Sequence, residues 1–207
     1  MSSRRIDSEV KRYASRARYN LTDLVQILNS NFICSVGFSM DEITYIDPMI
    51  YVNDGENLFL HCSPESRIYK VLNSDKIITI SVLNIRGVVL HSKISNNSIN
   101  YESAIIYGRG HEIKEMEEKI RIFRLLTDRI ISGRWDDAEI PSSEELSRVA
   151  VFRIGIVDFS LKVRDGFGME ITHNSIWEGV IPIELRYGEP IPAKESSLPE
   201  YIKNKLV

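Results

Sequence analysis

The alternation of apolar and polar residues predicts strands along most of the chain and helices in a few places. Apolar residues spaced three and four positions apart predict helices over 21–28 and 112–132, the second ending before Gly133. A third, shorter helix is expected to start within 141–145, where serines and glutamates follow a proline. Strands are expected at 31–38, 43–52, 57–62, 76–83, 87–91, 101–107 and 151–164.

Turn residues separate these apolar runs. Asn53-Asp54-Gly55-Glu56 predicts a hairpin, and residues 84–86 are expected to join two separate strands. Gly108-Arg109-Gly110 is interpreted as a turn that ends a strand. The run 31–38 is apolar on both faces, so burial on both sides is expected. Successive strands with inserted helices, rather than regular βαβ units, favour a mainly β, α+β fold: an antiparallel barrel with helices at its ends.

Composition limits the classes of protein that fit. The 207 residues carry 43% hydrophobic residues, 27% charged residues and a net charge of −3, which is typical of a globular domain and does not favour nucleic-acid binding. We expect one domain over 1–207, with an N-terminal arm at 1–19 and a loop-rich extension at 165–207. The chain contains no apolar run that could serve as a signal peptide or span a membrane. We therefore expect a cytoplasmic protein, with Cys34 and Cys62 as buried free thiols.

The stretch from Leu58 to Asn73 has the composition of a strand that turns directly into a helix. Ser63 is expected to cap this helix, with Pro64 at its first position. Ser66 and Arg67 would then lie in the opening turns, where a hydroxyl, a guanidinium and free amide groups can bind a phosphate. The alternative is a capped surface helix whose arginine is only solvated.

Other chemistry is absent or ambiguous in the sequence. There is no phosphate-loop motif and no serine-hydrolase elbow, and the histidines at 61, 91, 111 and 173 lack metal-ligand spacing, so no metal is expected. Lys162 and Arg164 share a strand face and could bind an anion, or form a solvated strand end. Trp135 could stack on a ring ligand or close the end of a core. His61 could be a hydrogen-bonded structural residue or could face the phosphate cap.

Several short segments, in one order, carry a resemblance to a known family. They are Arg16-Ala17-Arg18-Tyr19-Asn20, Cys34-Ser35-Val36-Gly37-Phe38, His61-Cys62-Ser63-Pro64-Glu65-Ser66-Arg67, Asn97-Ser98-Ile99-Asn100-Tyr101-Glu102-Ser103, Gly133-Arg134-Trp135, Lys162-Val163-Arg164 and Trp177-Glu178-Gly179-Val180-Ile181-Pro182. Across residues 14–200 the chain resembles the pyridoxamine 5′-phosphate oxidase-like flavin-binding proteins, in the branch near the nitroimidazole-resistance proteins.

The resemblance implies a split β-barrel homodimer with one FMN in each of two interface clefts. It implies an FMN phosphate at Ser66 and Arg67, with Lys162 near the flavin or its phosphate and Trp135 near the ring edge. Asn100 and Ser103 would reach the flavin from the partner chain. The residues that the resemblance places at the cofactor are Met49, Ile50, Tyr51, His61, Cys62, Ser63, Ser66, Arg67, Asn100, Ser103, Trp135 and Lys162.

Departures from the family pattern restrict the expected activity. Ile68 replaces a second cation, so phosphate binding would depend more on Lys70 or Lys162. Asn96-Asn97 stands where close relatives commonly carry two histidines, and the oxidase's C-terminal signatures are absent after Trp177. We expect an FMN-dependent oxidoreductase with a small, unidentified substrate and no oxidation of pyridoxamine phosphate. The alternative is a non-enzymatic carrier or sensor that binds flavin or haem.

Overall fold

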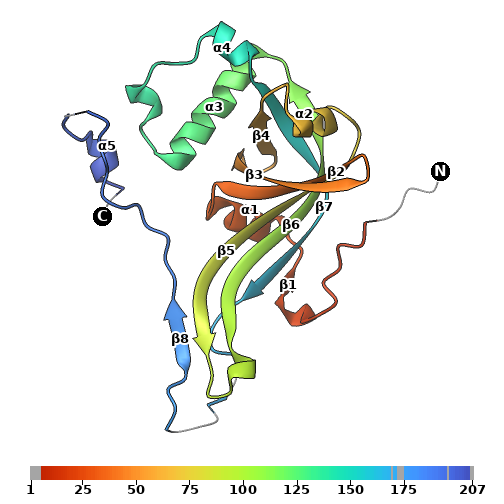
Figure 1. Cartoon of the computed structure of the whole chain (residues 1–207), viewed down its shortest axis with the longest axis vertical. Helices are drawn as coiled ribbons and strands as arrows, with labels where there is room; N and C mark the ends of the chain where they lie inside the picture. The colour runs from red at the N-terminus through yellow and green to blue at the C-terminus, as the bar shows by residue number, and fades with distance from the viewer. Residues whose placement is uncertain (1–5, 169, 172–174, 195, 206–207) are drawn as a thin grey trace.

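The computed structural model describes residues 6–168, 170–171, 175–194 and 196–205, and within them the chain forms one antiparallel sheet that closes on itself (Figure 1). The strand order is β1-β7-β4-β3-β2-β5-β6, and β6 also pairs with β7, which closes the ring. Helices lie at the ends and sides of this ring. The expected split barrel, mainly β with added helices, is confirmed.

The structure has the following elements. The strands are β1 (Ala17–Arg18), β2 (Ile33–Met40), β3 (Ile43–Asn53), β4 (Leu58–Cys62), β5 (Ile78–Leu90), β6 (Ser98–Ile113), β7 (Ala150–Arg164) and β8 (Gly179–Pro182). The α-helices are α1 (Leu21–Asn29), α2 (Arg67–Leu72), α3 (Met116–Ile130), α4 (Ser143–Ser147) and α5 (Glu200–Lys203). Short 3-10 helices are η1 (Ala14–Arg16), η2 (Ile94–Asn96) and η3 (Trp135–Asp137).

Helix α1 is capped at its N-terminal end and docked on the barrel at its C-terminal end. Asn20 caps it by accepting from the Asp23 amide at 2.8 Å. At the other end, Leu28 O accepts from the Tyr51 hydroxyl at 2.7 Å and from Arg129 at 3.0 Å. The last carbonyls of a helix have no intrahelical donor, so these side chains allow the helix end to be buried. The predicted helices at 21–28, 112–132 and 141–145 are confirmed, the second with tighter limits.

Strand β2 is buried on one face only, so the expectation of burial on both sides is wrong. Cys34, Val36 and Phe38 point into the core, whereas Ile33 is 48% exposed. The two faces alternate because successive side chains of a strand point in opposite directions. The outward face of β2 therefore presents apolar surface in a single chain.

Two further predictions about the strands are wrong. Residues 78–90 form the single strand β5, with only a bulge between Ile85 and Gly87, instead of two strands joined at 84–86. Strand β6 runs straight through Gly108–Gly110 instead of ending there. A Cβ on Gly110 would lie 2.4 Å from the Leu72 carbonyl oxygen, so this glycine permits close approach of α2 rather than a turn. The predicted hairpin is confirmed, with Gly55 at a φ of 96°.

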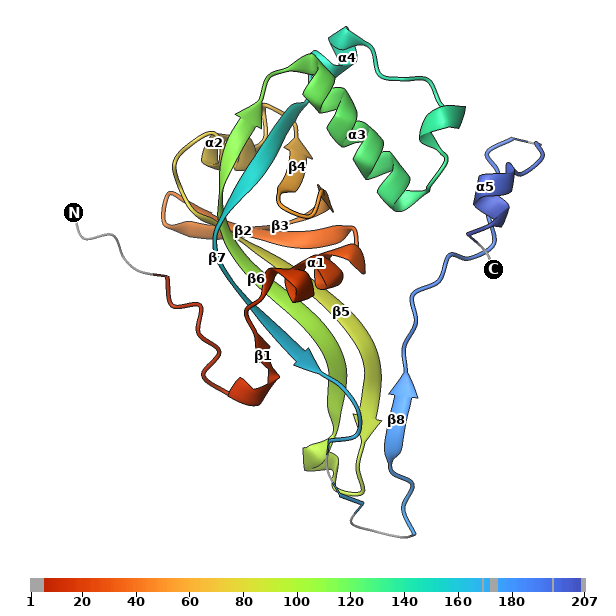
Figure 2. The ribbon, with the colours of Figure 1, turned by 180° about the vertical axis from the view of Figure 1, so that it is seen from behind.

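The two ends of the chain lie along the barrel (Figure 2). The N-terminal arm is held by β1 on β7 and by the hydroxyl of Ser8, which donates to Asp158 at 2.6 Å. The C-terminal extension adds β8 to the edge of β5, and then Tyr187 donates to Ile130 O at 2.6 Å. Within the part of the chain that the structure describes, no helix is long and apolar enough to cross a membrane. The organisation as one domain stays a prediction.

Candidate functional site

The junction between β4 and α2 is a tight turn followed by a short helix. Ser66 N donates to Ser63 O at 3.0 Å, which closes a turn with Pro64 inside it. Ser66, not Ser63, caps the helix: its hydroxyl accepts from the Tyr69 amide at 3.3 Å. The predicted cap at Ser63 and the helical position of Pro64 are therefore wrong. Ser63 closes the turn that precedes the helix, and Ser66, three residues later, is the cap. Ile68, Val71 and Leu72 are buried, as the apolar pattern predicts.

Arg67 is the first residue of α2 and extends into solvent. Its guanidinium lies over the Tyr45 ring at 4.3 Å and forms no ion pair with any described residue. Stacking on an aromatic face orients a guanidinium while its N–H donors stay available. The Ser66 hydroxyl, in contrast, already donates to Ser63 O at 2.6 Å. Arg67 is therefore the better-placed oxyanion ligand of the two.

The residues predicted to line the flavin lie on adjacent strands. Met49, Ile50 and Tyr51 lie in the last part of β3, which pairs with the β4 strand that carries His61 and Cys62. Tyr51 is 1% exposed, its hydroxyl donates to Leu28 O and its amide donates to Phe32 O at 2.9 Å, so neither group is free for a ligand in this chain.

His61 is half-buried, 5.6 Å from the Phe123 ring, and its buried Nδ1 has no hydrogen-bond partner among the residues that the structure describes. Burial lowers the pKa of His61 and raises that of Cys62, so both side chains are uncharged near neutral pH.

Asn100, Ser103 and Lys162 form a second group on β6 and β7. Ser103 and Lys162 are directly opposite each other, and the Ser103 hydroxyl lies 3.4 Å from Lys162 O. Asn100 is 3% exposed and accepts from Arg164 at 2.6 Å. Arg164 itself is buried, so the predicted solvated strand end does not describe it.

The two groups are well separated in one chain. His61 is paired with Val151 on β7, whereas Ser103 is paired with Lys162 on the same strand. The strand between residues 151 and 162 spans about 36 Å at ~3.3 Å per residue. Figure 1 shows β7 running along most of the barrel between these two regions. A single chain therefore does not bring Lys162 to Arg67.

Trp135 lies apart from both groups. It opens η3 after the end of α3 and is half-buried. Nearby, Tyr201 of α5 donates to Asp137 at 2.8 Å and accepts from Arg134 at 3.2 Å. Within one chain this places Trp135 near the packed end of α3, and its predicted contact with a flavin stays a prediction.

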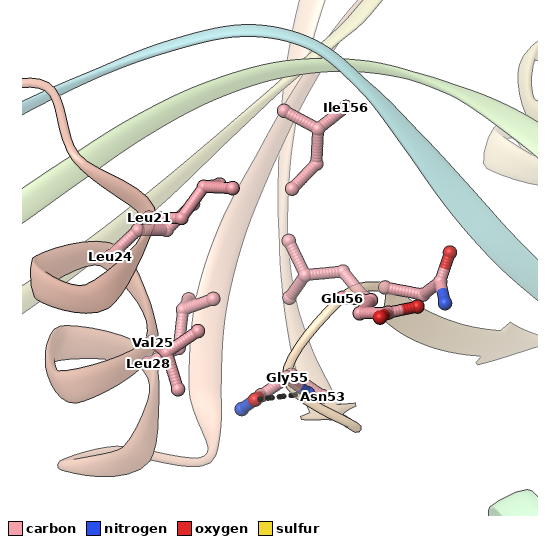
Figure 3. A pocket seen from close by; sticks show the side chains of 10 residues that line it. Leu21, Leu24, Val25, Leu28, Asn53, Gly55, Glu56 and Ile156 are labelled. Carbon is pink, nitrogen blue, oxygen red and sulfur yellow. Dashed lines mark hydrogen bonds between the residues drawn. The ribbon is translucent and has the colours of Figure 1, made fainter.

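The cavities differ in what they could hold. The cavity between α1 and the 53–57 hairpin, lined by Leu21, Leu24, Val25 and Ile156 among others, has a volume of about 10 Å³ (Figure 3). That volume holds no more than one water molecule. A hollow of about 430 Å³ lies between α3 and α4, lined partly by Phe123 and Leu146. Among the described residues no group of histidines, cysteines and acids has the geometry of a metal site.

Sequence reasoning missed Tyr45 and Tyr13 as parts of the candidate sites. Tyr45 is the platform for Arg67, and Tyr13 lies 5.6 Å from the Lys162 ammonium. Each contact joins positions far apart in the sequence. Only the spacing of Lys162 and Arg164 on one strand gave any signal of a basic site there.

Comparisons with known proteins agree with this fold. The chain is 27% identical to the flavocytochrome Anf3 from Azotobacter vinelandii, with 96% of this chain and 95% of that chain covered and a TM-score of 0.85. A FAD- and haem-binding protein from Mycobacterium smegmatis is 24% identical, with coverages of 92% and 97% and a TM-score of 0.82. A candidate 5-nitroimidazole antibiotic resistance protein from Bacteroides thetaiotaomicron is 21% identical, with coverages of 71% and 86% and a TM-score of 0.60. No curated protein matches the sequence.

The family assignment rests on the barrel and on a match over most of its strands. The model for the pyridoxamine 5′-phosphate oxidase family matches residues 21–163, from the start of α1 to the penultimate residue of β7. The chain therefore belongs to the pyridoxamine 5′-phosphate oxidase family.

Proposed function

We propose that this protein is a flavin-dependent oxidoreductase that binds FMN at a homodimer interface. The observation that carries the proposal is Arg67, an unpaired guanidinium held on the Tyr45 ring in a chain of this family. The similarity to a flavocytochrome, 27% identical over nearly the whole chain, supports a flavin cofactor. A bound flavin supplies the electron transfer, and the protein supplies binding, orientation and electrostatic tuning.

The residues present fit a flavin phosphate. Arg67 can donate two parallel hydrogen bonds to one phosphate, and the amides of Arg67 and Ile68 begin α2 without intrahelical acceptors. The main-chain edge at Met49 and Ile50, which has no partner on β4, and the uncharged pair His61 and Cys62 would line the ring. No described side chain among them is placed as an obvious general acid or base.

A second chain would complete the site. Lys162 on β7 and its paired residue Ser103 on β6 lie far from Arg67 within one chain. We therefore propose that Lys162 reaches the flavin from the partner chain, together with Asn100 and Ser103. The outward face of β2, β3 and β5 supports such a dimer. Ile46 is 70% exposed there, and Ile33 and Leu83 are each 48% exposed. Apolar sheet surface of this kind favours association with a second copy.

Access for a substrate would be provided by the polar segment 92–98. Ile94 in η2 is 84% exposed, and Asn97 accepts from the His91 amide at 2.8 Å. An asparagine can orient a substrate by hydrogen bonds but does not supply a proton near neutral pH. We therefore expect slow turnover of quinones or nitroaromatic compounds and none of pyridoxamine phosphate.

A second candidate function is a haem-containing carrier or sensor. It is favoured by the buried Nε2 of His91, which has no hydrogen-bond partner among the described residues while its ring packs 4.2 Å from Phe167. Histidine nitrogens are common axial ligands of haem iron. The absorbance spectrum of the purified protein distinguishes the two, because flavin and haem bands differ.

The test of the flavin site compares Arg67→Ala with Arg148→Ala. Arg148 is also an exposed arginine at a short helix, but it is paired with Glu144. Loss of a charge-assisted contact of about 1.5–3 kcal/mol should weaken FMN binding about ten- to a hundredfold in Arg67→Ala only. Equal FMN affinity in both variants, measured by fluorescence quenching, would place the phosphate site elsewhere. A flavin-loaded monomer in light scattering would refute the interface.

A further inference from the structure

Three cationic side chains surround the Tyr13 ring on the N-terminal arm, and a fourth cation, Arg164, lies close by on β7. The guanidinium of Arg16 lies 4.3 Å from the ring centre and that of Arg12 lies 5.1 Å from it. The Lys162 ammonium approaches the same ring to 5.6 Å. Arg164 lies two residues beyond Lys162 on β7, so its side chain is on the same face of the strand. We call Arg12, Tyr13, Arg16, Lys162 and Arg164 the Tyr13 cluster.

The fold builds this cluster from segments far apart in the sequence. Strand β1 pairs Ala17 with Lys162, which brings η1 and the arm onto the end of β7 (Figure 2). Tyr13 precedes η1 with a φ of 57°, a left-handed conformation that is uncommon for a tyrosine. This backbone shape turns the arm so that Arg12 and Arg16 lie on one ring. The cluster is therefore built by the contact of the arm with β7.

The charges in the cluster are not neutralised within the described chain. None of its four cations forms an ion pair with a described residue. Three acids on the same arm and strand contact other groups: Asp7 pairs with Lys11, Asp158 accepts from Ser8, and Asp165 accepts from the Gly166 amide. The fourth, Glu9, forms no ion pair with a described residue. The excess positive charge therefore remains.

The burial of Arg164 makes this excess of positive charge energetically unfavourable. It is only 8% exposed, and its described hydrogen bonds go to neutral oxygens of Asn100, at 2.6 Å, and Ile99, at 3.4 Å. Burial and, next, the charge of Arg16 lower the pKa of Arg164. A buried charge without an opposite charge is unfavourable unless a ligand compensates it. An anion bound here would offset that cost.

We propose that the Tyr13 cluster binds the diphosphate group of a nucleotide. Arginine forks bind two oxygens of one phosphate, and a lysine adds a point charge, so this set matches a group with several negative charges. The aromatic ring holds the cations together without neutralising them.

The inference rests on the proposed function in one respect. Lys162 and Ser103 are paired directly, so in the proposed dimer the cluster lies beside the flavin site. Two nucleotides could then supply the diphosphate: the dinucleotide form of the flavin, or a nicotinamide dinucleotide that donates electrons to it. Both present the same group to the cluster.

The first experiment measures binding of inorganic pyrophosphate to the full chain by calorimetry. Wild type should bind it, and Arg16→Gln, Lys162→Gln and Arg164→Gln should each weaken binding about ten- to a hundredfold. Lys11→Gln is the matched control, because it removes a paired charge from the same arm. Because Arg164 is buried, its substitution can disturb the fold, so the less buried Arg16 and Lys162 are also changed. Circular dichroism checks that each variant is folded. No binding by wild type, or equal binding by the cluster variants and Lys11→Gln, overturns the proposal.

The second experiment identifies the source of the diphosphate. If the cluster holds a flavin dinucleotide, Arg16→Gln should carry less FAD relative to FMN than wild type in chromatography of the released flavin. If it holds a nicotinamide dinucleotide, the released flavin should be unchanged and the dissociation constant for that nucleotide should rise about tenfold. No change in either quantity overturns the assignment to a nucleotide. If the wild-type protein contains no flavin, the proposed function is refuted but the anion site is not. Pyrophosphate binding is measured separately and does not depend on the flavin.

Discussion

The carbonyl of Leu28 allows a quantitative test of how α1 is held on the barrel. It accepts hydrogen bonds from two side chains, Tyr51 at 2.7 Å and Arg129 at 3.0 Å. Tyr51→Phe removes one donor but leaves the carbonyl satisfied, so the free energy of unfolding should fall by only about 1 kcal/mol. Arg129→Met leaves the Tyr51 bond in place, although it also removes a 3.2 Å contact with Asn31 O, and should cost about 1.5 kcal/mol.

The double variant should cost more than the sum of the two single changes. With both donors removed, Leu28 O would be buried without a partner, and that penalty is about 1–3 kcal/mol beyond the lost bonds. A coupling energy of at least about 1 kcal/mol is therefore expected from urea unfolding followed by circular dichroism.

A control cycle uses a distant arginine. Arg148 directly follows α4 and pairs with Glu144 rather than with any group near Tyr51, so Tyr51→Phe and Arg148→Met should add within about 0.5 kcal/mol. If the Tyr51 and Arg129 changes were also additive, either donor alone would not be enough to keep the Leu28 carbonyl satisfied. The proposed role of the two donors in docking α1 would then be refuted.

Three further changes test individual features by chemical denaturation. Gly110→Ala places a Cβ 2.4 Å from Leu72 O and should destabilise the fold by more than about 2 kcal/mol, whereas Gly188→Ala, with open space around it, should change little. Asn20→Ala removes the α1 cap and should cost about 1 kcal/mol. Burial raises the pKa of Cys34 to about 12, so the native state keeps a proton that the unfolded chain loses above pH ~8.5. Stability should therefore fall above that pH by up to about 1.4 kcal/mol per unit, and Cys34→Ala should remove this slope.

Local elements could be predicted where one short pattern decides the structure. Asn20, followed by apolar residues at helical spacing, predicted α1. Gly55 predicted the hairpin, because glycine readily adopts the positive φ that this turn contains. Gly110 misled because a glycine that permits a turn and one that permits close packing look the same in a sequence. Only the position of Leu72 in space distinguishes them.

The candidate sites were predictable only in part, for a related reason. Arg67 could be named from its neighbours, but the Tyr45 ring beneath it comes from a different strand. The pairing of Ser103 with Lys162 depends on a strand register set over 59 residues. The Tyr13 cluster depends on the arm folding back along β7, which the alternating charges of that arm do not indicate.

The Tyr13 cluster and the proposed flavin site differ in whether they need a second chain, and this difference gives a last test. A monomer should keep the Tyr13 cluster and lose the flavin site. Every residue of the Tyr13 cluster comes from one chain, whereas the proposed flavin site needs Lys162 and Ser103 of a partner. Leu83, 48% exposed and directly opposite Ser103, lies on the proposed interface, so Leu83→Asp should give a monomer in light scattering. That monomer should lose flavin while its pyrophosphate affinity stays within about twofold of wild type. Val157→Asp, which changes an exposed residue of β7, is the control and should leave both properties unchanged. A Leu83→Asp monomer that retains flavin would show that one chain holds the cofactor by itself, and loss of both ligands together would show that the cluster also needs the partner.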